Sequence, residues 1–264
     1  MLRVDNLKLK YDEEIIVEDV SFNIEKNSIT TIIGPNGCGK STILKAISRT
    51  KKPSKGNIYL EDKNIREIDP KVISQKMAIV PQSPMVPEDF TVRDLIGYGR
   101  YPYLGWMGKL TKKDYEIIDW AIYETRLEQL QHRQISTMSG GERQRAWIAM
   151  ALAQKPDILL LDEPTTYLDI SHQFELLELV RKLNKKMNIT IVMVLHDLNQ
   201  AARYSDNIIV IKDHRKYLEG PPEKIITKDV LENVFNISVK VVYDEDNKCP
   251  FFIPVNSKNV QNII

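Results

Sequence analysis

The sequence predicts an α/β fold with a mainly parallel sheet. Three short apolar runs rich in branched residues, 29–33, 158–161 and 189–195, are separated by helical patterns. Runs of this kind are typical of strands buried on both faces of a parallel sheet. The first run leads into a glycine-rich stretch, and a helical pattern follows that stretch. This strand–loop–helix order is typical of α/β cores.

The glycine-rich stretch reads GPNGCGKST and matches the pattern G-x-x-x-x-G-K-[ST]. Glycines let successive backbone N–H groups converge on phosphate oxygens without an interfering Cβ. Lys40 would supply positive charge for the β- and γ-phosphates, and the Ser41 hydroxyl would bind Mg²⁺. Cys38 either fills a position open to small residues or makes the loop sensitive to thiol reagents. The predicted nucleotide-binding residues are Gly34, Pro35, Asn36, Gly37, Cys38, Gly39, Lys40, Ser41 and Thr42.

Two acids end the second apolar run, where Asp162 and Glu163 precede Pro164. Carboxylates at the end of a buried strand are costly unless they meet a cation or act in chemistry. We expect Asp162 to hold Mg²⁺, through water, and Glu163 to act as general base on the attacking water. The alternative is a strand-to-turn segment that only caps a helix.

A histidine ends the third apolar run. His196 would emerge on the same ligand-binding edge of the sheet as Glu163. A neutral imidazole there could donate a hydrogen bond to a γ-phosphate, although a lone histidine is more often structural. The remaining histidines lack such a position, and we interpret them as surface or packing residues: His132, His172 and His214.

A third motif, Ser139-Gly140-Gly141, precedes the helical pattern 142–153. Serine is a favoured N-cap residue, and the two glycines would leave N–H donors exposed. Such a helix start binds an anion, here a γ-phosphate.

From Met1 to about Phe235 the chain resembles the nucleotide-binding subunit of ATP-binding cassette (ABC) transporters. The family's order and spacing are matched by the phosphate loop, Gln82 after the strand 77–81, the signature MSGGE at 138–142, Asp162-Glu163, Leu168-Asp169 and His196. Met138 and Glu142 replace the family's usual leucine and glutamine, both outside the Ser-Gly-Gly core.

The resemblance implies a P-loop NTPase (RecA-like) core that binds ATP and Mg²⁺. It also implies that Tyr11 stacks on adenine, although an exposed aromatic side chain there could simply pack. Gln82 would contact Mg²⁺ and the attacking water, and Asp169 would cross a dimer interface. One phosphate loop and one signature per chain require a second copy, or a homologue, for a competent unit.

We expect one nucleotide-binding domain over residues 1–264. Its expected parts are an antiparallel β part (1–33), an ATPase core (34–85 and 156–219), a helical signature subdomain (86–155) and a C-terminal extension (220–264). In the first part the short runs 2–4, 15–17 and 20–24 predict strands. In the extension we expect a helix near 229–235 and strands at 239–243 and 251–255.

Composition limits the partners. With 37 basic and 36 acidic residues, the chain has no net field for nucleic acid. Two cysteines suit a reducing cytoplasm. No apolar run approaches the roughly 18–20 residues of a membrane span, and the N-terminus lacks a signal-peptide pattern. The resemblance to ABC transporters implies integral membrane permease subunits and, indirectly, an extracytoplasmic substrate-binding protein as partners, with this chain peripheral on the cytoplasmic face of the membrane.

Four segments resemble importers of iron-siderophore, haem and cobalamin complexes: 91–103, 145–154, 166–173 and 195–201. We favour a ferric siderophore, with haem or cobalamin as alternatives. Chromosome and repair members carry long coiled coils and translation members carry two cassettes, and this chain has neither feature. A non-hydrolysing nucleotide-gated module is a further alternative, which Glu163 and His196 argue against. We also expect a permease helix to dock near Arg100 and its flanking tyrosines.

Overall fold

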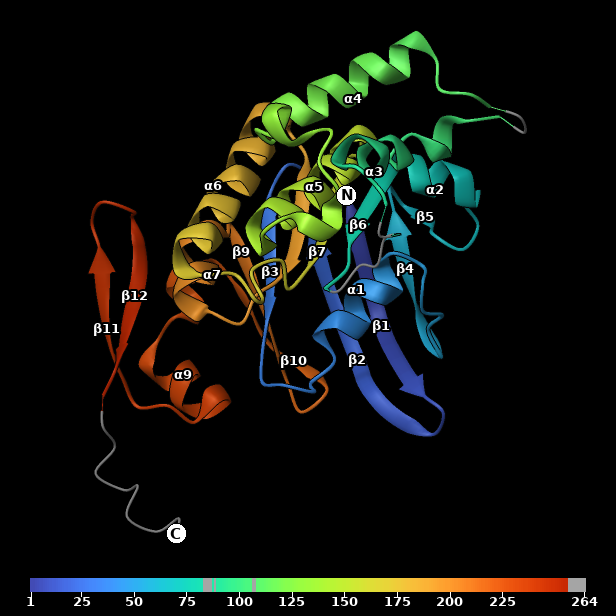
Figure 1. Cartoon of the computed structure of the whole chain (residues 1–264). Coiled ribbons are helices and arrows are strands. Elements are labelled where there is room, and N and C mark those ends of the chain that lie inside the picture. Colours follow the sequence, from blue (N-terminus) through green and yellow to red (C-terminus); the bar gives the residue numbers. More distant parts are fainter. Residues whose placement is uncertain (83–86, 88, 106–107, 256–264) are drawn as a thin grey trace. The chain divides into compact units, whose positions relative to one another are not determined.

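The computed structural model describes residues 1–82, 87, 89–105 and 108–255. The chain forms two compact units, which are described separately (Figure 1). The first unit comprises Met1–Asn64 and Met193–Ile264, and the second comprises Ile65–Val192. Within the described ranges, no helix has the length and apolar character needed to cross a membrane.

An antiparallel sheet begins the first unit. Its strand order is β2-β1-β4-β5, with β1 at Leu2–Tyr11, β2 at Glu14–Ile24, β4 at Lys55–Leu60 and β5 at Lys63–Asn64. The predicted runs 15–17 and 20–24 form one strand rather than two. Asp19 has a φ of 53°, and the pairing register of β1 and β2 shifts between Leu7 and Leu9, so a bulge absorbs the break in alternation.

A second group of strands in the first unit places the phosphate loop. The strand β3 (Ile29–Ile33) is buried at every residue and pairs in parallel with β9 (Asn207–Lys212). The strand β10 (Arg215–Gly220) pairs antiparallel with β9. The helix α1 (Lys40–Ile47) follows the loop after β3. The C-terminal part adds α7 (Leu198–Tyr204), α8 (Pro222–Ile225), α9 (Lys228–Phe235), β11 (Val239–Asp244) and β12 (Cys249–Pro254).

Parallel strands and helices build the second unit. The strand β6 (Met77–Val80) pairs in parallel with β7 (Ile158–Asp162), and β8 (Thr190–Val194) neighbours β7. The helices are α2 (Pro70–Lys76), α3 (Val92–Tyr98), α4 (Lys112–Glu124), α5 (Gly140–Ala153) and α6 (Ile170–Met187). Single 3₁₀ turns lie at Tyr101–Tyr103, Glu128–Leu130 and Ile135–Thr137. The predicted α/β class, with its mainly parallel sheet and antiparallel N-terminal sheet, is confirmed.

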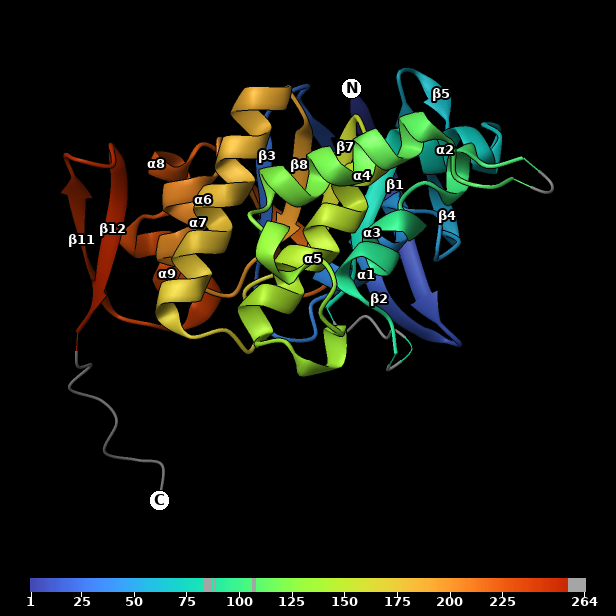
Figure 2. The same cartoon turned by 45° about the horizontal axis from the view of Figure 1, so that its top comes forward.

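The helices α3, α4 and α5 pack together in the second unit (Figure 2). Each begins at a hydroxyl N-cap, Thr91, Thr111 or Ser139, that forms a capping box with the acid three residues later. A capping box satisfies two backbone N–H groups at the helix start. In each of the three helices, residues next to the N-terminus therefore determine where the helix begins.

Arg100 ties these helices together from the inside. Its side chain is only 6% exposed, and its Nε lies 2.9 Å from Asp114 Oδ1 on α4. A second guanidinium nitrogen donates to the carbonyl of Ala153 at the end of α5 at 2.6 Å. The guanidinium also lies 3.9 Å from the ring centroid of Tyr103. The expectation that Arg100 anchors a permease helix is wrong, because its guanidinium group is buried and already bonded to Asp114 and to the carbonyl of Ala153.

We expect Arg100→Ala to destabilise the chain by about 3–5 kcal/mol, because it leaves a buried carboxylate without its cation. The exposed Arg66→Ala is the matched control, and urea unfolding is the measurement. The pKa of Asp114 is lowered to about 2 from 3.8, first by the Thr111 hydroxyl and then by the Thr111 backbone and Arg100. The stabilisation that the ionised Asp114 carboxylate contributes to the folded chain is therefore complete above pH 3.8 and is lost as the pH falls through about 2. Equal unfolding midpoints for the two variants at pH 7 would contradict the structural role.

Candidate functional site

The phosphate loop holds its lysine at the centre. Lys40 is 5% exposed, and its Nζ donates to the carbonyl oxygens of Gly34 and Pro35 at 2.9 Å each. These bonds keep a buried ammonium group in the curve of the loop, where the start of α1 also presents backbone N–H groups. Positive charge and helix-start N–H groups thus converge on one point, which suits the phosphates of a nucleotide.

Two loop glycines are required by close backbone approach. A Cβ on Gly39 (φ 103°) would lie 2.6 Å from the carbonyl oxygen of Ile16 on β2. A Cβ on Gly34 would lie 2.1 Å from the carbonyl oxygen of Ile211 on β9. Neither backbone oxygen can move aside as a flexible side chain would. The loop is therefore pressed against strands of its own unit and is held in one shape.

Cys38 is 5% exposed, and its thiol fills space inside the loop. Burial raises the pKa of this thiol, against a smaller opposing effect of Lys40. A thiol that stays protonated is a poor nucleophile. Of the two interpretations of Cys38, the small packing residue is the one that the structure supports.

Tyr11 lies at the end of β1 and is 43% exposed. The Nζ of Lys51 lies 3.8 Å from the centroid of its ring, at cation–π distance. Lys51, which the sequence marks only as part of a charged run, thus covers one face of this aromatic ring. His196, also in the first unit, is exposed and follows the end of β8 by two residues.

The second unit brings the predicted base and the predicted glutamine together. Gln82 Nε2 donates to Glu163 Oε2 at 2.5 Å, and the Thr166 hydroxyl donates to the same oxygen at 3.3 Å. Glu163 has a φ of 51°, a left-handed conformation that is uncommon for this residue and typical of functional turns. Asp162, the last residue of β7, is 4% exposed. The two acids that the sequence singles out therefore differ in setting: one is buried in the strand, and the other is held by two donors.

The signature opens α5 as predicted. The Ser139 hydroxyl accepts from the N–H of Glu142 at 3.3 Å, and the Glu142 carboxylate accepts from the N–H of Ser139 at 2.9 Å. The latter bond is the main reason why the pKa of Glu142 is lowered. Glu142, which departs from the family's usual glutamine, therefore completes the capping box at this helix start.

Asp169 and the signature are linked by a histidine that the sequence does not mark as functional. Asp169 Oδ1 accepts from the backbone N–H of His172 at 2.9 Å and lies 2.7 Å from Nδ1 of its ring. These bonds, with the Ser171 hydroxyl at 3.0 Å, lower the pKa of Asp169. A Cβ on Gly141 would lie 2.8 Å from Cδ2 of the His172 ring. His172, interpreted from the sequence as a surface or packing residue, thus packs between the start of α6 and the start of α5.

Gly141→Ala should overpack against the His172 ring and destabilise the chain by about 1–3 kcal/mol. His172→Ala should then relieve most of that cost in the double variant, because the two residues are in contact. Gly140→Ala is the matched control, since its Cβ would meet the flexible end of Leu168 at 3.3 Å and the carbonyl oxygen of Tyr167 at an ordinary contact distance of 3.6 Å. A double-mutant cycle of unfolding free energies measures the coupling. Additive costs for Gly141→Ala and His172→Ala would contradict it.

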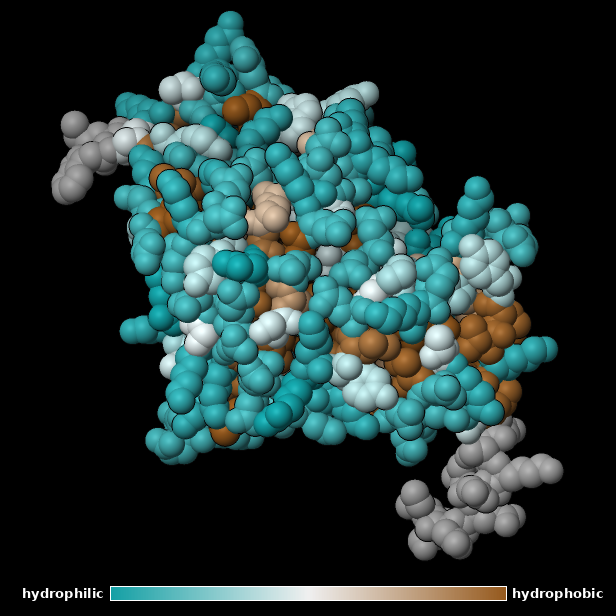
Figure 3. All heavy atoms as spheres, turned by 180° about the vertical axis from the view of Figure 1, so that it is seen from behind, coloured by the Kyte–Doolittle hydropathy of each residue, from teal (hydrophilic) through white to brown (hydrophobic). Residues whose placement is uncertain are grey.

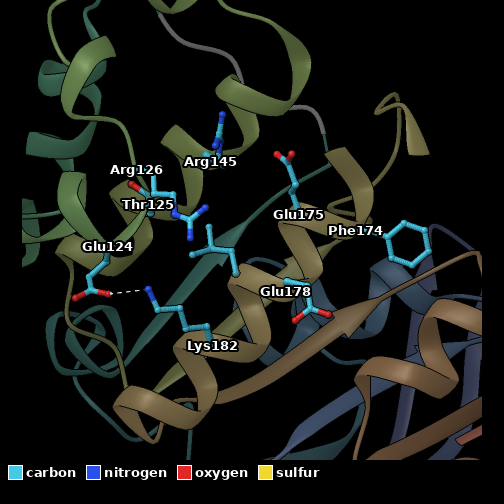
Figure 4. Close-up of a pocket in the computed structure, with 9 residues that line it drawn as sticks. Glu124, Thr125, Arg126, Arg145, Phe174, Glu175, Glu178 and Lys182 are labelled. Atoms are coloured by element: carbon cyan, nitrogen blue, oxygen red, sulfur yellow. Dashed lines mark ion pairs between the residues drawn. The ribbon is translucent and has the colours of Figure 1, made fainter. Parts of the chain in front are cut away.

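A separate cavity of about 440 Å³ lies in the second unit, at the C-terminal end of α4, beside Arg145 of α5 and along α6 (Figure 4). Glu124, only 3% exposed, faces Lys182 at 4.0 Å across it and pairs with Lys186. None of the predicted site residues lines this cavity. The ion pairs of Glu124 with Lys182 and Lys186 link α4 to α6 within the unit.

The predicted site residues are divided between the two units. The first unit holds Tyr11, the phosphate loop and His196, and the second holds Gln82, Asp162, Glu163, Asp169 and residues 139–141. Among the described residues, no three His, Cys, Asp or Glu side chains form a group that could hold a metal ion. A bound metal ion would therefore depend on the oxygen donors predicted from the sequence, which are those of Ser41, Gln82 and Asp162.

Comparison with known proteins adds to this geometry. A family model described as ABC transporter matches residues 17–166. Iron(3+)-hydroxamate import ATP-binding protein FhuC of Bacillus subtilis is 47% identical over 249 residues, which cover 94% of this chain and 93% of that protein.

Solved structures agree. A metal-chelate type ABC transporter in an inward-facing conformation has a TM-score of 0.84 and 28% identity, and the match covers 97% of each chain. The dimeric ATP-binding cassette MJ0796 bound to ADP and Pi has a TM-score of 0.73 and 29% identity over 84% of this chain and 98% of that one. With the family model spanning more than half of the sequence, and with a relative at this identity over nearly all of it, the chain belongs to the ABC transporter family.

Proposed function

We propose that this chain hydrolyses ATP to power an importer of ferric siderophores. The observation that carries hydrolysis is the pair formed by Gln82 and Glu163 at the end of β7. A module that only senses nucleotide has no need for a carboxylate oriented by two donors. The phosphate loop, with its central Lys40, supplies the binding half of the same function.

In the proposed reaction the oxygen of a water molecule bonds to the γ-phosphorus, and the bond to the β–γ bridging oxygen breaks. Glu163 accepts the proton of that water, and Gln82 holds the carboxylate in place. Lys40 and the N–H groups of the loop stabilise charge on the phosphates. His196 donates to the γ-phosphate. ADP and phosphate are the products.

The donors predicted for Mg²⁺ are the Ser41 hydroxyl, the Gln82 amide and the Asp162 carboxylate. One carboxylate with hydroxyl and amide oxygens fits this ion, which usually keeps waters and substrate phosphates among its ligands. When bound, Mg²⁺ would neutralise charge that develops on the β- and γ-phosphates. The low exposure of Asp162 suits a carboxylate whose partner is a cation.

A second copy would complete each site. The start of α5, with Ser139 capped and Gly140 and Gly141 in its first turn, leaves helix-start N–H groups for an anion. In the proposed dimer these groups serve the γ-phosphate bound by the partner chain, and Asp169 lies at the interface. The dimeric state of the MJ0796 cassette supports this arrangement.

The permease would bind the second unit at an aromatic groove of about 520 Å³. Phe90, Tyr98 and Tyr101 line it with ring centroids 5.1 and 4.5 Å apart, and Tyr101 is 54% exposed. Aromatic side chains are favoured anchors at interfaces. Through this contact the chain would be held at the cytoplasmic face of the membrane, with a substrate-binding protein acting on the other side.

Deletion of the gene tests the substrate. We expect uptake of a ferric hydroxamate to fall to background and to return with the wild-type chain, because import depends on ATP turnover here. Tyr101→Ser should restore less uptake while keeping the ATPase rate of the isolated chain. Loss of haem or cobalamin uptake alone would assign the cargo to those alternatives, and unchanged uptake of all three would reject the import function.

A further inference from the structure

The C-terminal hairpin, β11 with β12, exposes an unusual amount of apolar surface. Tyr243, Phe251 and Ile253 are 51%, 41% and 47% exposed. Figure 3 shows hydrophobic surface gathered beside the C-terminal end of the described chain. An isolated two-stranded hairpin is only marginally stable in water and gains stability when a further strand or helix packs on it. Whether a strand can add depends on which edge of the hairpin has unpaired backbone groups.

The outer edge of β12 is closed to another strand. Phe252 donates its N–H to Asn199 Oδ1 at 3.0 Å, and its carbonyl accepts from Asn199 Nδ2 at 3.2 Å. Two residues to either side stand Pro250 and Pro254, which have no N–H to donate. A side chain of α7 and two prolines thus block strand addition on this side.

The outer edge of β11 is open. Since Phe252 directs its backbone groups away from β11, its partner Val241 directs its own away from β12. Val239 and Tyr243 do the same, because backbone direction alternates along a strand. Among the described residues no strand pairs along this edge, since β11 and β12 form a two-stranded sheet. Figures 1 and 2 show β11 as the outer strand.

A groove of about 750 Å³ runs along the open edge. It is lined by five consecutive residues of β11, 239–243, and on its other wall by Ile226 and Thr227 between α8 and α9. Consecutive residues point to opposite faces of a strand, so a groove that touches all five includes the strand edge, although it also reaches Pro250 of β12 and Val255. Such an edge accepts an added strand through main-chain hydrogen bonds.

We propose that the occupant is β11 of a second copy of this chain, paired antiparallel about a twofold axis at Val242. In this register Val241 exchanges hydrogen bonds with the partner's Tyr243. Lys240 then lies directly opposite the partner's Asp244, and symmetry forms this ion pair twice. The strand is therefore complementary to itself in charge as well as in backbone geometry.

The neighbouring registers lack this complementarity. A shift that preserves hydrogen-bond direction moves the pairing by two residues, which places Lys240 or Asp244 opposite an uncharged valine. Cross-strand pairs of opposite charge stabilise a sheet by about 0.2–1 kcal/mol each. The proposed contact needs no nucleotide, so it goes beyond the ATP-dependent dimer and would keep two copies together between turnovers.

Disulfide trapping without nucleotide tests the proposal. In the proposed register two copies of residue 242 face each other at about 4.5 Å between Cα atoms, which is within disulfide range. Under mild copper-catalysed oxidation, Val242→Cys should form at least about tenfold more covalent dimer than Ile253→Cys. Ile253 is more exposed than Val242 and lies on the same face, but it is on β12, opposite Lys240, so its two copies would be roughly 20 Å apart. The unmodified chain, whose two cysteines are buried, sets the background.

Charge reversal tests the register. In the Val242→Cys background, Lys240→Glu and Asp244→Lys should each lower the dimer yield about tenfold, because like charges then face each other twice. An equal mixture of the two variants should restore it, because both cross-chain pairs are again of opposite charge. Equal cross-linking by Val242→Cys and Ile253→Cys, or no recovery in the mixture, would overturn the proposal. ATPase activity measured on the same preparations separates this result from failure of the hydrolytic function.

Discussion

We expect Glu163→Gln to abolish ATP turnover and to leave ATP binding intact. The amide keeps the shape of the side chain and can still accept from Gln82 and Thr166, but it cannot take a proton from water. General base catalysis contributes about 10²–10⁴-fold, so kcat should fall by at least about 100-fold. Steady-state phosphate release and nucleotide binding, measured together, check both parts.

The same substitution should trap a dimer. When ATP is bound but not cleaved, the nucleotide stays between the two chains, so size-exclusion chromatography with ATP and Mg²⁺ should show a larger species. Glu175→Gln, an exposed carboxylate on α6, is the matched control and should hydrolyse ATP normally. A Glu163→Gln chain that remains monomeric and turns over at the wild-type rate refutes the base role.

Lys40→Ala and Ser139→Arg should each stop turnover, for different reasons. The first removes the ammonium group that the loop holds between two carbonyl oxygens, and ATP affinity should fall with it. The second leaves the loop intact and blocks the helix start that we propose serves the partner chain, so affinity should persist. Removal of one such stabilising group costs about 10²–10³-fold in rate. Lys45→Ala, an exposed lysine of α1, is the control for the first change.

Mixing the two inactive chains distinguishes the arrangement in trans. A mixed dimer has one composite site with an intact loop from one chain and an intact signature from the other, whereas neither homodimer has any. We expect ATPase activity to reappear on mixing. If none returns although cross-linking shows mixed dimers, the signature does not act across the interface.

The parts of the site that the sequence predicts are those with local chemistry. The phosphate loop is one contiguous pattern, and the capping box of α5 needs only Ser139 and an acid three residues later. The strands of the N-terminal sheet are harder to predict, because Asp19 interrupts the apolar–polar alternation of β2 while a bulge keeps the strand continuous. A sequence pattern predicts a helix, strand or loop only where interactions between neighbouring residues determine its geometry.

Arg100 and His172 show why the rest could not be predicted. An arginine between tyrosines resembles an interface anchor, but its fate depends on Asp114, which is fourteen residues away and directed inward by α4. His172 acquires its meaning from contact with Gly141, which lies on another helix. Neither contact can be recognised in the sequence, because each exists only after the helices have packed.

The buried thiol of Cys38 has a consequence for a protein that works beside imported iron. Iron and peroxide together generate oxidants, and a cysteine is oxidised mainly as its thiolate. Burial keeps Cys38 protonated, so peroxide finds little reactive sulfur in the phosphate loop. A sulfenic acid formed there would add oxygen to a space already filled by the fold. Burial and the raised pKa of its thiol thus make Cys38 a poor target for peroxide inside the phosphate loop.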